Sequence, residues 1–223
     1  MKANLFTFLA AVVLVAACQD KAKTPTPAAE TEPAKAAQAK TFKSSSVKAI
    51  DPVDVDPSQT ISGEMVEGIT WEDKNGQNTV VLTEKHSDEE ATASLQAFQY
   101  VHQAQAPRQL WKMNDGVEEC EFDIVCRYIK ESLVVTDLDK DNTGEVWFVY
   151  YLACKSDVSP SIMKLMMYEG GKKYVARGET LVDSGGGQMH GGEMVMDAQL
   201  KAAGNVFTDF AQKHWKKHMK ETF

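Results

Sequence analysis

Val146-Trp147-Phe148-Val149-Tyr150-Tyr151 is the stretch of sequence that decides the fold. All six residues are β-branched or aromatic, and these residue types are enriched in strands. Successive side chains of a strand point to opposite faces, so both faces of this strand are apolar. A strand that is apolar on both faces is typical of a buried, central position. We therefore predict a central strand over residues 146–153.

The surrounding segments predict an antiparallel sheet made of hairpins. Asn75-Gly76 and Gly170-Gly171 each separate two runs rich in strand-forming residues, and Asn-Gly in such a place is a strong hairpin signal. The other predicted strands cover residues 69–73, 79–83, 93–102, 109–113, 133–136, 163–168 and 174–178. Residues 183–193 are rich in glycine and are predicted to form a mobile loop.

The end of the chain changes from strand to helix patterning. Asn205 is a suitable N-cap for a helix that begins at Val206. The residues that recur there at helical spacing are Phe207, Phe210, Ala211, His214 and His218. The sequence thus predicts an α+β fold, mainly an antiparallel β-sheet of hairpins, packed by a C-terminal α-helix.

The start of the chain indicates export. Lys2 precedes a short apolar run over residues 5–15, and small residues follow. This order is typical of a secretory signal peptide, which we assign to residues 1–17. The run is too short to span a bilayer, which needs about 20 apolar residues.

The end of this segment, Val15-Ala16-Ala17-Cys18, resembles the lipobox of bacterial lipoproteins. The resemblance implies cleavage before Cys18 and acylation of that residue, so that the mature protein is held to a membrane by lipid. Gln19 stands where an aspartate usually retains Gram-negative lipoproteins at the inner membrane, which implies an outer-membrane, extracytoplasmic location that is periplasmic or surface-facing. The alternative is an ordinary signal peptide with a cysteine nearby.

Composition divides the remainder into two parts. Residues 18–59 hold five prolines among small and polar residues, and such a segment cannot bury enough apolar surface to fold alone. We predict that they form a disordered tether after the lipidated cysteine, and that residues 60–223 form one β-rich domain. The formal net charge of -8 argues against nucleic acid as a partner.

The strongest chemical motif is the acidic stretch 137–145. Its oxygen-bearing residues alternate in a spacing that suits a hard cation such as Ca²⁺. The predicted ligands are the side chains of Asp137, Asp139, Asp141 and Glu145 and the backbone carbonyl of Thr143. The alternative is a solvated acidic turn without a cation. If a calcium ion binds, we expect it to be structural.

The acidic stretch is not an EF-hand, because Phe148 occupies the place of the bidentate glutamate. A strand-loop-strand DxDxDxxxE instead resembles the calcium loops of integrin-alpha FG-GAP repeats. The usual glycine at the sixth position is Asn142, and asparagine tolerates a left-handed backbone better than most residues.

Besides Cys18, the chain contains Cys120, Cys126 and Cys154. In an exported protein, three cysteines suggest one disulfide and one leftover thiol. Six extended residues span about 20 Å, so Cys120 and Cys126 can pair only across a turn. Cys154 is therefore the expected partner of one of them, and we choose Cys120. A catalytic thiol is the alternative.

Other candidate sites are weaker. His214 and His218 are four residues apart on the predicted helix, but the pattern fits polar edges of an apolar stripe better than a metal site. The glycine-rich segment lacks the Lys-Ser/Thr of a phosphate loop. The sequence contains no G-x-S-x-G motif and no convincing acid pair for glycoside hydrolysis.

Three stretches together resemble a family of bacterial lipoproteins labelled surface polysaccharide biosynthesis proteins. They are Val135-Thr136-Asp137-Leu138-Asp139, Cys154-Lys155-Ser156-Asp157-Val158-Ser159-Pro160 and Lys164-Leu165-Met166-Met167-Tyr168-Glu169-Gly170. In that pattern Cys120 and Cys154 match family cysteines, whereas Cys126 is extra. The resemblance implies a role at the cell envelope and supplies no catalytic residue.

These observations lead to a hypothesis of function. We expect a non-enzymatic, membrane-anchored envelope lipoprotein that binds or supports surface polysaccharide or its assembly machinery. One alternative is a calcium-dependent enzyme that acts on envelope glycan through Asp137, Asp139 or Glu145. Another is a structural or inhibitor-like partner of a protein.

Overall fold

Strand β8 (Glu145–Lys155) is the centre of the computed structural model, which describes residues 41–89, 91–102 and 106–223. Residues 145–152 are all buried. Phe148 and Tyr150 point into one apolar core, and Trp147 and Val149 point into another. The predicted central strand, apolar on both faces, is confirmed.

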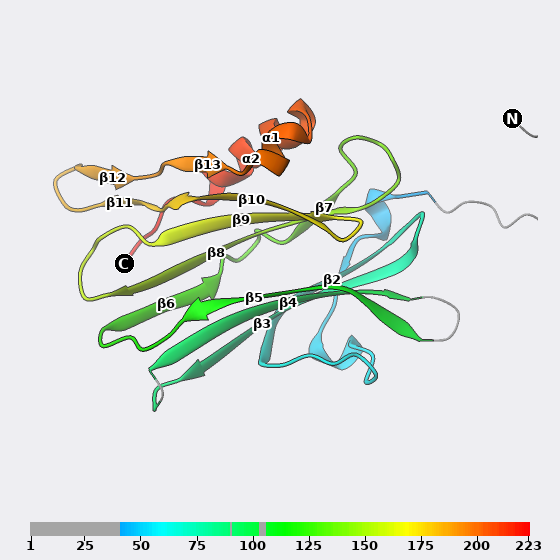
Figure 1. Ribbon diagram of the computed structural model, residues 1–223, viewed down its shortest axis with the longest axis horizontal. Helices are drawn as coiled ribbons and strands as arrows, with labels where there is room; N and C mark the ends of the chain where they lie inside the picture. Colours follow the sequence, from blue (N-terminus) through cyan, green and yellow to red (C-terminus); the bar gives the residue numbers. More distant parts are fainter. Residues whose placement is uncertain (1–40, 90, 103–105) are drawn as a thin grey trace, which may run out of the picture. The chain divides into compact units, whose positions relative to one another are not determined.

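The strands form two main antiparallel sheets (Figure 1). In spatial order, sheet A contains β1 (Lys48–Ala49), β2 (Glu64–Asp73), β3 (Gly76–Ser87), β4 (Thr92–His102) and β5 (Pro107–Val117). Sheet B contains β13 (Met194–Met196), β10 (Lys172–Glu179), β9 (Ile162–Glu169), β8 and β6 (Asp123–Tyr128), and β7 (Val134–Thr136) also pairs with β8. A separate ribbon pairs β11 (Leu181–Asp183) with β12 (Met189–Gly191).

The described residues form three layers, which are visible in Figure 1. Sheet A and sheet B enclose a core in which the rings of Trp111 and Tyr168 stack with their centroids 3.8 Å apart. The other face of sheet B is covered by α1 (Ala198–Ala202) and α2 (Asn205–His218), whose apolar side chains meet Trp147. The predicted fold class is confirmed: a mainly antiparallel β-structure with a C-terminal helix packed on it.

Helix α2 buries the face that its sequence pattern predicts. Phe207, Ala211, His214, Trp215 and His218 are its buried residues. The helix begins one residue earlier than predicted, because Gly204, and not Asn205, is the N-cap. Gly204 has a φ of 112°, a conformation that an L-residue with a side chain rarely adopts.

Most predicted hairpins and strands are present, and several short strands are added to them. Strand β5 is longer than the predicted 109–113, and β6 was not predicted. The glycine-rich segment is partly ordered as strand β12, which pairs with β11. Short helices η1 (Ser44–Ser46) and η2 (Pro52–Asp54) precede sheet A.

The ordered structure begins before residue 60, unlike the predicted tether boundary. Strand β1 pairs with β2, and Gln59 contacts His102 at 3.2 Å between the two Nε2 atoms. The Tyr100 hydroxyl donates a hydrogen bond to the Thr60 carbonyl at 2.6 Å. Backbone groups make several of these contacts, so the polar composition of residues 41–59 gave no sign of them.

The predictions for residues 1–40 lie outside the described residues. They comprise the signal peptide, the lipidation of Cys18 and the first part of the tether. In the part of the chain that is described, no helix is both long and apolar enough to cross a membrane.

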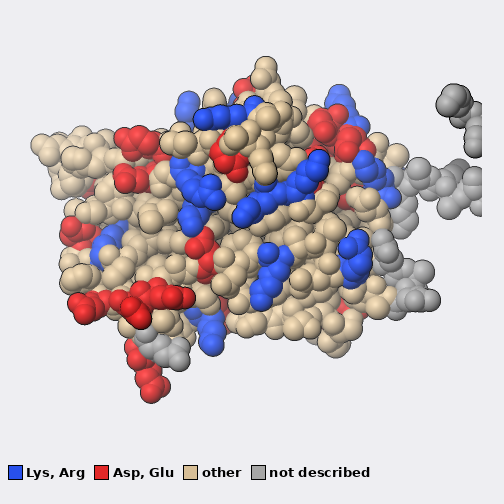
Figure 2. All heavy atoms as spheres, in the orientation of Figure 1, with Lys and Arg blue, Asp and Glu red and all other residues tan. Residues whose placement is uncertain are grey.

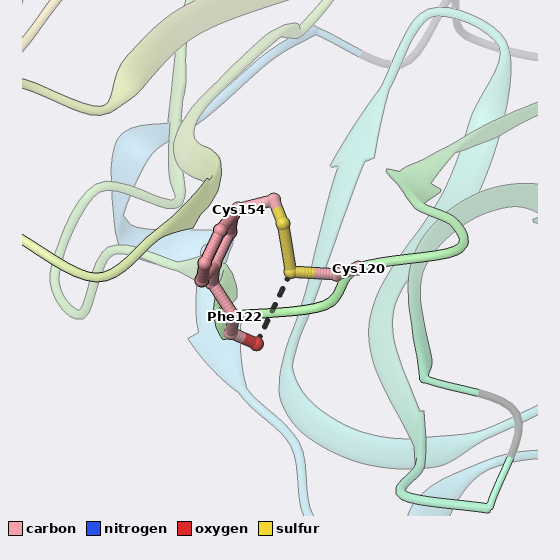
Figure 3. Close-up of a disulfide and its surroundings, with 3 residues drawn as sticks. All are labelled: Cys120, Phe122 and Cys154. Atoms are coloured by element: carbon pink, nitrogen blue, oxygen red, sulfur yellow. Dashed lines mark hydrogen bonds between the residues drawn. A yellow bond between two sulfur atoms is a disulfide. The ribbon is translucent and has the colours of Figure 1, made fainter.

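The disulfide joins Cys120, after β5, to Cys154 in β8 (Figure 3). Their Cα atoms are 5.6 Å apart, within the range that a disulfide requires. Cys126 is free and buried, and burial raises the pKa of its thiol to about 12. A thiol with this pKa is protonated at neutral pH, whereas the thiolate is the nucleophilic form. The predicted pairing is confirmed.

Candidate metal site

The acidic loop, residues 137–145, leads from β7 into the start of β8. The chain turns twice within it, at Lys140 (φ 62°) and Asn142 (φ 66°). Asp139 Oδ1 accepts a hydrogen bond from the Asp141 N–H at 3.1 Å, and Asp141 Oδ1 accepts one from the Thr143 N–H at 2.7 Å. Such Asx turns are the local reason why aspartate at every second position suits this loop.

The turns bring carboxylates together in two overlapping groups. One oxygen each from Asp137, Asp139 and Glu145 lie within 4.8 Å of one another. Asp139, Asp141 and Glu169 form a second group by the same measure. Two unit charges 4 Å apart repel each other by about 4 kcal/mol at an effective dielectric constant of 20. A divalent cation would remove this repulsion.

Glu145 is the fully buried member of the first group of carboxylates. Its carboxylate accepts hydrogen bonds from the Thr136 hydroxyl at 2.6 Å and from the Leu138 N–H at 2.8 Å. Thr136 in turn accepts a bond from the indole N–H of Trp147 at 2.9 Å. Burial raises the pKa of Glu145 to about 7, although the bonds from Thr136 and Leu138 act in the opposite direction.

Glu169, at the end of β9, is a site residue that the sequence did not predict. Its Oε1 atom is buried and has no hydrogen-bond partner within the described structure. Burial and the nearby charges of Asp139 and Asp141 raise the pKa of this carboxyl. The pairing of Val146 with Tyr168 explains its place, since continuing that register sets Glu169 opposite Glu145.

The β2–β3 turn of sheet A closes over the acidic loop. Asp73 is buried, and its Oδ2 atom accepts hydrogen bonds from the Trp71 indole and the Gly144 N–H, both at 3.1 Å. A Cβ atom on Gly144 would lie 2.4 Å from the Trp71 indole nitrogen, so a glycine is needed at this position. The loop is therefore fixed from two sheets.

Lys74 is a basic residue whose side chain contacts the acidic loop. Its ammonium group donates to Asp141 Oδ2 at 2.7 Å and to the Asp141 carbonyl at 3.0 Å. Burial by itself would raise the pKa of Asp141, but the bonds from Lys74 and Thr143 outweigh this effect and lower it. The pKa of Lys74 is raised, chiefly by its hydrogen bond to Asp141.

The structure thus brings together three predicted ligands, Asp137, Asp139 and Glu145. Asp141 belongs to the second group, and Thr143 contributes its N–H to the loop. The additional residues are Asp73 at the end of β2, Lys74 in the β2–β3 turn and Glu169 at the end of β9. Acidic residues that could bind a metal ion are therefore present, and oxygen ligands of this kind suit a hard cation.

The two histidines of α2 do not join this site. His214 Nε2 lies 2.9 Å from the Ser132 carbonyl, and its ring contacts that of His218 with centroids 4.6 Å apart. Both rings are buried in the core between sheet B and the helix. Within the described residues, the groups of carboxylates and other ligands that could hold a metal contain neither histidine.

The acidic side chains of this end of the molecule gather at the upper right of Figure 2, over the loop between β7 and β8. Asp139 and Asp141 are exposed, whereas Asp137 is half-buried. An ion at this place would have solvent on one side and the buried Glu145 on the other.

Comparisons of the chain with protein-family models, with curated proteins and with solved structures found no match.

Proposed function

We propose that the acidic loop binds one Ca²⁺ ion and that this ion is structural. The observation that carries the proposal is the convergence of Asp137, Asp139 and Glu145 within 4.8 Å. Ca²⁺ takes 6 to 8 oxygen ligands in flexible geometry, so the Thr143 carbonyl and water would complete the shell. Mg²⁺ demands a near-ideal octahedron and gives up its water reluctantly, which makes it the less suitable ion.

The surroundings of the loop support a structural role. Asp73 and Lys74 tie the loop to sheet A, and Glu145 begins the central strand of sheet B. An ion held here would fix the contact between the two sheets at one end of β8. Catalysis at Glu145 would need access to a substrate, and this carboxylate is fully buried.

We further propose that the protein is a non-enzymatic envelope lipoprotein. Its support is the sequence from Val15 to Cys18, which resembles a lipobox, and the resemblance of roughly residues 110–223 to lipoproteins linked with surface polysaccharide. In this proposal the lipid on Cys18 holds the chain at the outer membrane. The domain then binds surface polysaccharide or a protein that assembles it.

Radiolabelled palmitate tests the anchor. The chain should incorporate label, and Cys18→Ser should abolish incorporation and release the protein from the membrane fraction. Label retained in Cys18→Ser would contradict lipidation at this residue.

A deletion strain tests the role at the envelope. The amount or length of its surface polysaccharide should change, and the wild-type chain should restore it. An unchanged polysaccharide, together with no binding of isolated envelope glycan by the purified chain, would contradict the proposal.

The calcium-dependent enzyme is the second candidate, and the exposure of Asp139 and Asp141 is the observation that favours it. An ion held by these side chains would be open to a substrate on its solvent side, where it would act as a Lewis acid. Turnover of isolated envelope glycan that disappears in Asp139→Ala, while the variant stays folded, would favour this candidate over the binding protein.

A further inference from the structure

The end of β8 opposite the acidic loop carries an exposed apolar surface beside the disulfide. Phe122, which follows Cys120, is 59% exposed, and Ile162 at the start of β9 is 51% exposed. Figure 3 shows the Phe122 ring next to the Cys120–Cys154 disulfide. Two further large apolar residues are exposed near them: Val158, in the connection from β8 to β9, and Phe223, whose ring centroid lies 4.8 Å from the Lys155 ammonium group. We call this set the disulfide-end surface: Phe122, Val158, Ile162 and Phe223.

A groove is lined by two of these residues, Phe122 and Ile162. Its volume is about 450 Å³, and its lining includes Phe122, Cys154, Asp157, Pro160 and Ile162. The Cys120 sulfur lies 3.2 Å from the Phe122 carbonyl oxygen, so the disulfide fixes the backbone that presents Phe122. A groove with preset walls loses little conformational entropy when it is filled.

Exposed acidic residues lie in or next to the groove lining. They are Asp157, which lines the groove, and Glu121 and Asp123, which flank Phe122. Residues 118–123 and 156–162 contain neither Lys nor Arg. Figure 2 shows the acidic side chains in a row at the lower left, over the connection between β5 and β6.

Lys155, the basic residue of the groove lining, is already engaged. Its ammonium group donates to the Ser159 carbonyl at 2.6 Å and to the Ser161 hydroxyl at 2.8 Å. It also pairs with the buried Glu221 at 3.3 Å. The charge of Lys155 is thereby compensated within the protein, so the rim of the groove is left acidic.

We propose that the disulfide-end surface docks a polypeptide segment in which an apolar side chain is flanked by Lys or Arg. The apolar residue fills the groove beside Phe122 and Ile162, and the basic residues face the acidic rim. The same acidic rim repels an anionic lipid surface, and it repels its own copy in a symmetric dimer. This surface lies outside the acidic loop, so its test is independent of calcium binding.

Selection from a library of short random peptides, displayed on phage and panned against the full chain in detergent, tests the proposal. The enriched peptides should carry Lys or Arg beside an apolar residue. A synthetic peptide of the enriched sequence is then titrated by fluorescence anisotropy. Higher salt should weaken its binding, because the charged contacts are at the solvent-exposed rim.

Surface variants locate the contact. Phe122→Ser and Ile162→Ser should each weaken binding about tenfold, as expected for central apolar anchors. Glu121→Gln combined with Asp157→Asn should weaken binding and reduce its dependence on salt. The matched controls are Val195→Ser, an exposed apolar residue of β13, and Glu64→Gln, an exposed acid of β2, and neither should change the affinity.

The proposal is overturned if no peptide is enriched, if the enriched peptides are acidic, or if the controls weaken binding as much as Phe122→Ser. It is also overturned if Phe122→Ser abolishes self-association in sedimentation or binding to anionic vesicles, since either result assigns the surface to a different occupant. Because Phe122 and Ile162 are exposed, their variants should keep the thermal midpoint of the wild type.

Discussion

At the scale of single residues, the acidic loop depends on polar side chains that are shielded from water. Asp73 accepts three hydrogen bonds, from the Trp71 indole, the Gly144 N–H and the Asn75 N–H. A buried donor that loses its acceptor costs about 1–3 kcal/mol. The stability of this end of the molecule should therefore respond sharply to a single carboxylate.

We expect Asp73→Ala to lower the free energy of unfolding by about 2–4 kcal/mol, because it leaves the Trp71 and Gly144 donors without their partner. Asp73→Asn should lower it less, since the amide oxygen can still accept. The matched control is Asp183→Ala, whose carboxylate accepts a bond from the Gly185 N–H on the surface. Urea unfolding measures all three variants, and an equal loss in Asp73→Ala and Asp183→Ala would contradict the argument.

His218 should make stability depend on pH. Burial, helped by electrostatic interaction with His214 and Lys217, lowers its pKa from 6.5 to about 4. Its Nε2 atom has no hydrogen-bond partner in the described structure, and the Tyr151 hydroxyl bonds to its carbonyl and not to its ring. The unfolded chain therefore binds a proton between pH 6.5 and 4 that the folded chain excludes.

The contribution of the neutral His218 ring to the free energy of unfolding is complete above pH 6.5 and is lost as the pH falls toward 4. The loss is at most about 3 kcal/mol. His214 is lowered in the same direction, chiefly by burial, and adds to the effect. Thermal unfolding across this pH range should be less steep in His218→Leu than in the wild type. An identical slope in both proteins would show that His218 does not cause the dependence.

The sequence predicted the residues of the loop itself better than their partners from other strands. Asp137, Asp139 and Glu145 share one short stretch, so their spacing alone indicates a common site. Glu169 and Asp73 are polar residues at strand ends, and they join the site through the β8–β9 register and the approach of sheet A. Without an independent measure of that register, neither residue could be distinguished from a surface acid.

At the scale of elements, the disulfide connects the chain between β5 and β6 to the central strand. It closes a loop with a sequence separation of 34 residues. In the chain-entropy account, a loop of this length contributes about 3–4 kcal/mol by restricting the unfolded chain. The link also joins the segment after sheet A to sheet B.

Reduction should therefore lower the free energy of unfolding of the wild type by about 3–4 kcal/mol. The double variant Cys120→Ala, Cys154→Ala should show a similar loss and no further response to reductant. Cys126→Ala should keep the full response, because Cys126 is free. Chemical unfolding with and without reductant measures these effects, and an insensitive wild type would contradict the assigned pairing.

Lys74 connects the β2–β3 turn to the acidic loop and should compete with a cation for Asp141. Removing its charge in Lys74→Met should tighten calcium binding about two- to fivefold, in line with the modest energy of an exposed ion pair. The control is Lys85→Met, an exposed residue farther along β3. Calorimetry gives both affinities, and weaker binding in Lys74→Met would show that Lys74 supports the site.

The sequence predicted the strands that have a clear β-rich pattern. It did not predict the strands that form mainly by pairing with a neighbouring strand. The β2–β3 and β9–β10 hairpins have glycine turns between β-rich runs. Strand β6 contains Asp123, Cys126 and Arg127 and has no comparable pattern, and it forms by pairing with β8. Residues 41–59 are polar in composition and are ordered through contacts with sheet A.

At the scale of the whole described structure, β8 connects the two apolar cores, the acidic loop and the disulfide-end surface. One of its faces belongs to the core between the sheets, and the other belongs to the core under α2. The acidic loop leads into its first residue, and the disulfide-end surface lies around its last residues. Acidic residues thus lie at both ends of β8. At its start they converge in the acidic loop, and at its end they lie beside an apolar groove.

The most direct test of the central claim is a calorimetric Ca²⁺ titration of the full chain in detergent, after treatment with chelator. Calcium should bind at one site, and binding should be lost in Asp139→Asn because Asp139 belongs to both groups of carboxylates. At a calcium concentration of 100 times Kd, the ion should stabilise the fold by about 2.7 kcal/mol. Asp157→Asn, an exposed acid with the same kind of Asx turn at the other end of β8, should bind as the wild type does. No heat and no thermal shift in the wild type, or equal loss of binding in both variants, would contradict the metal site.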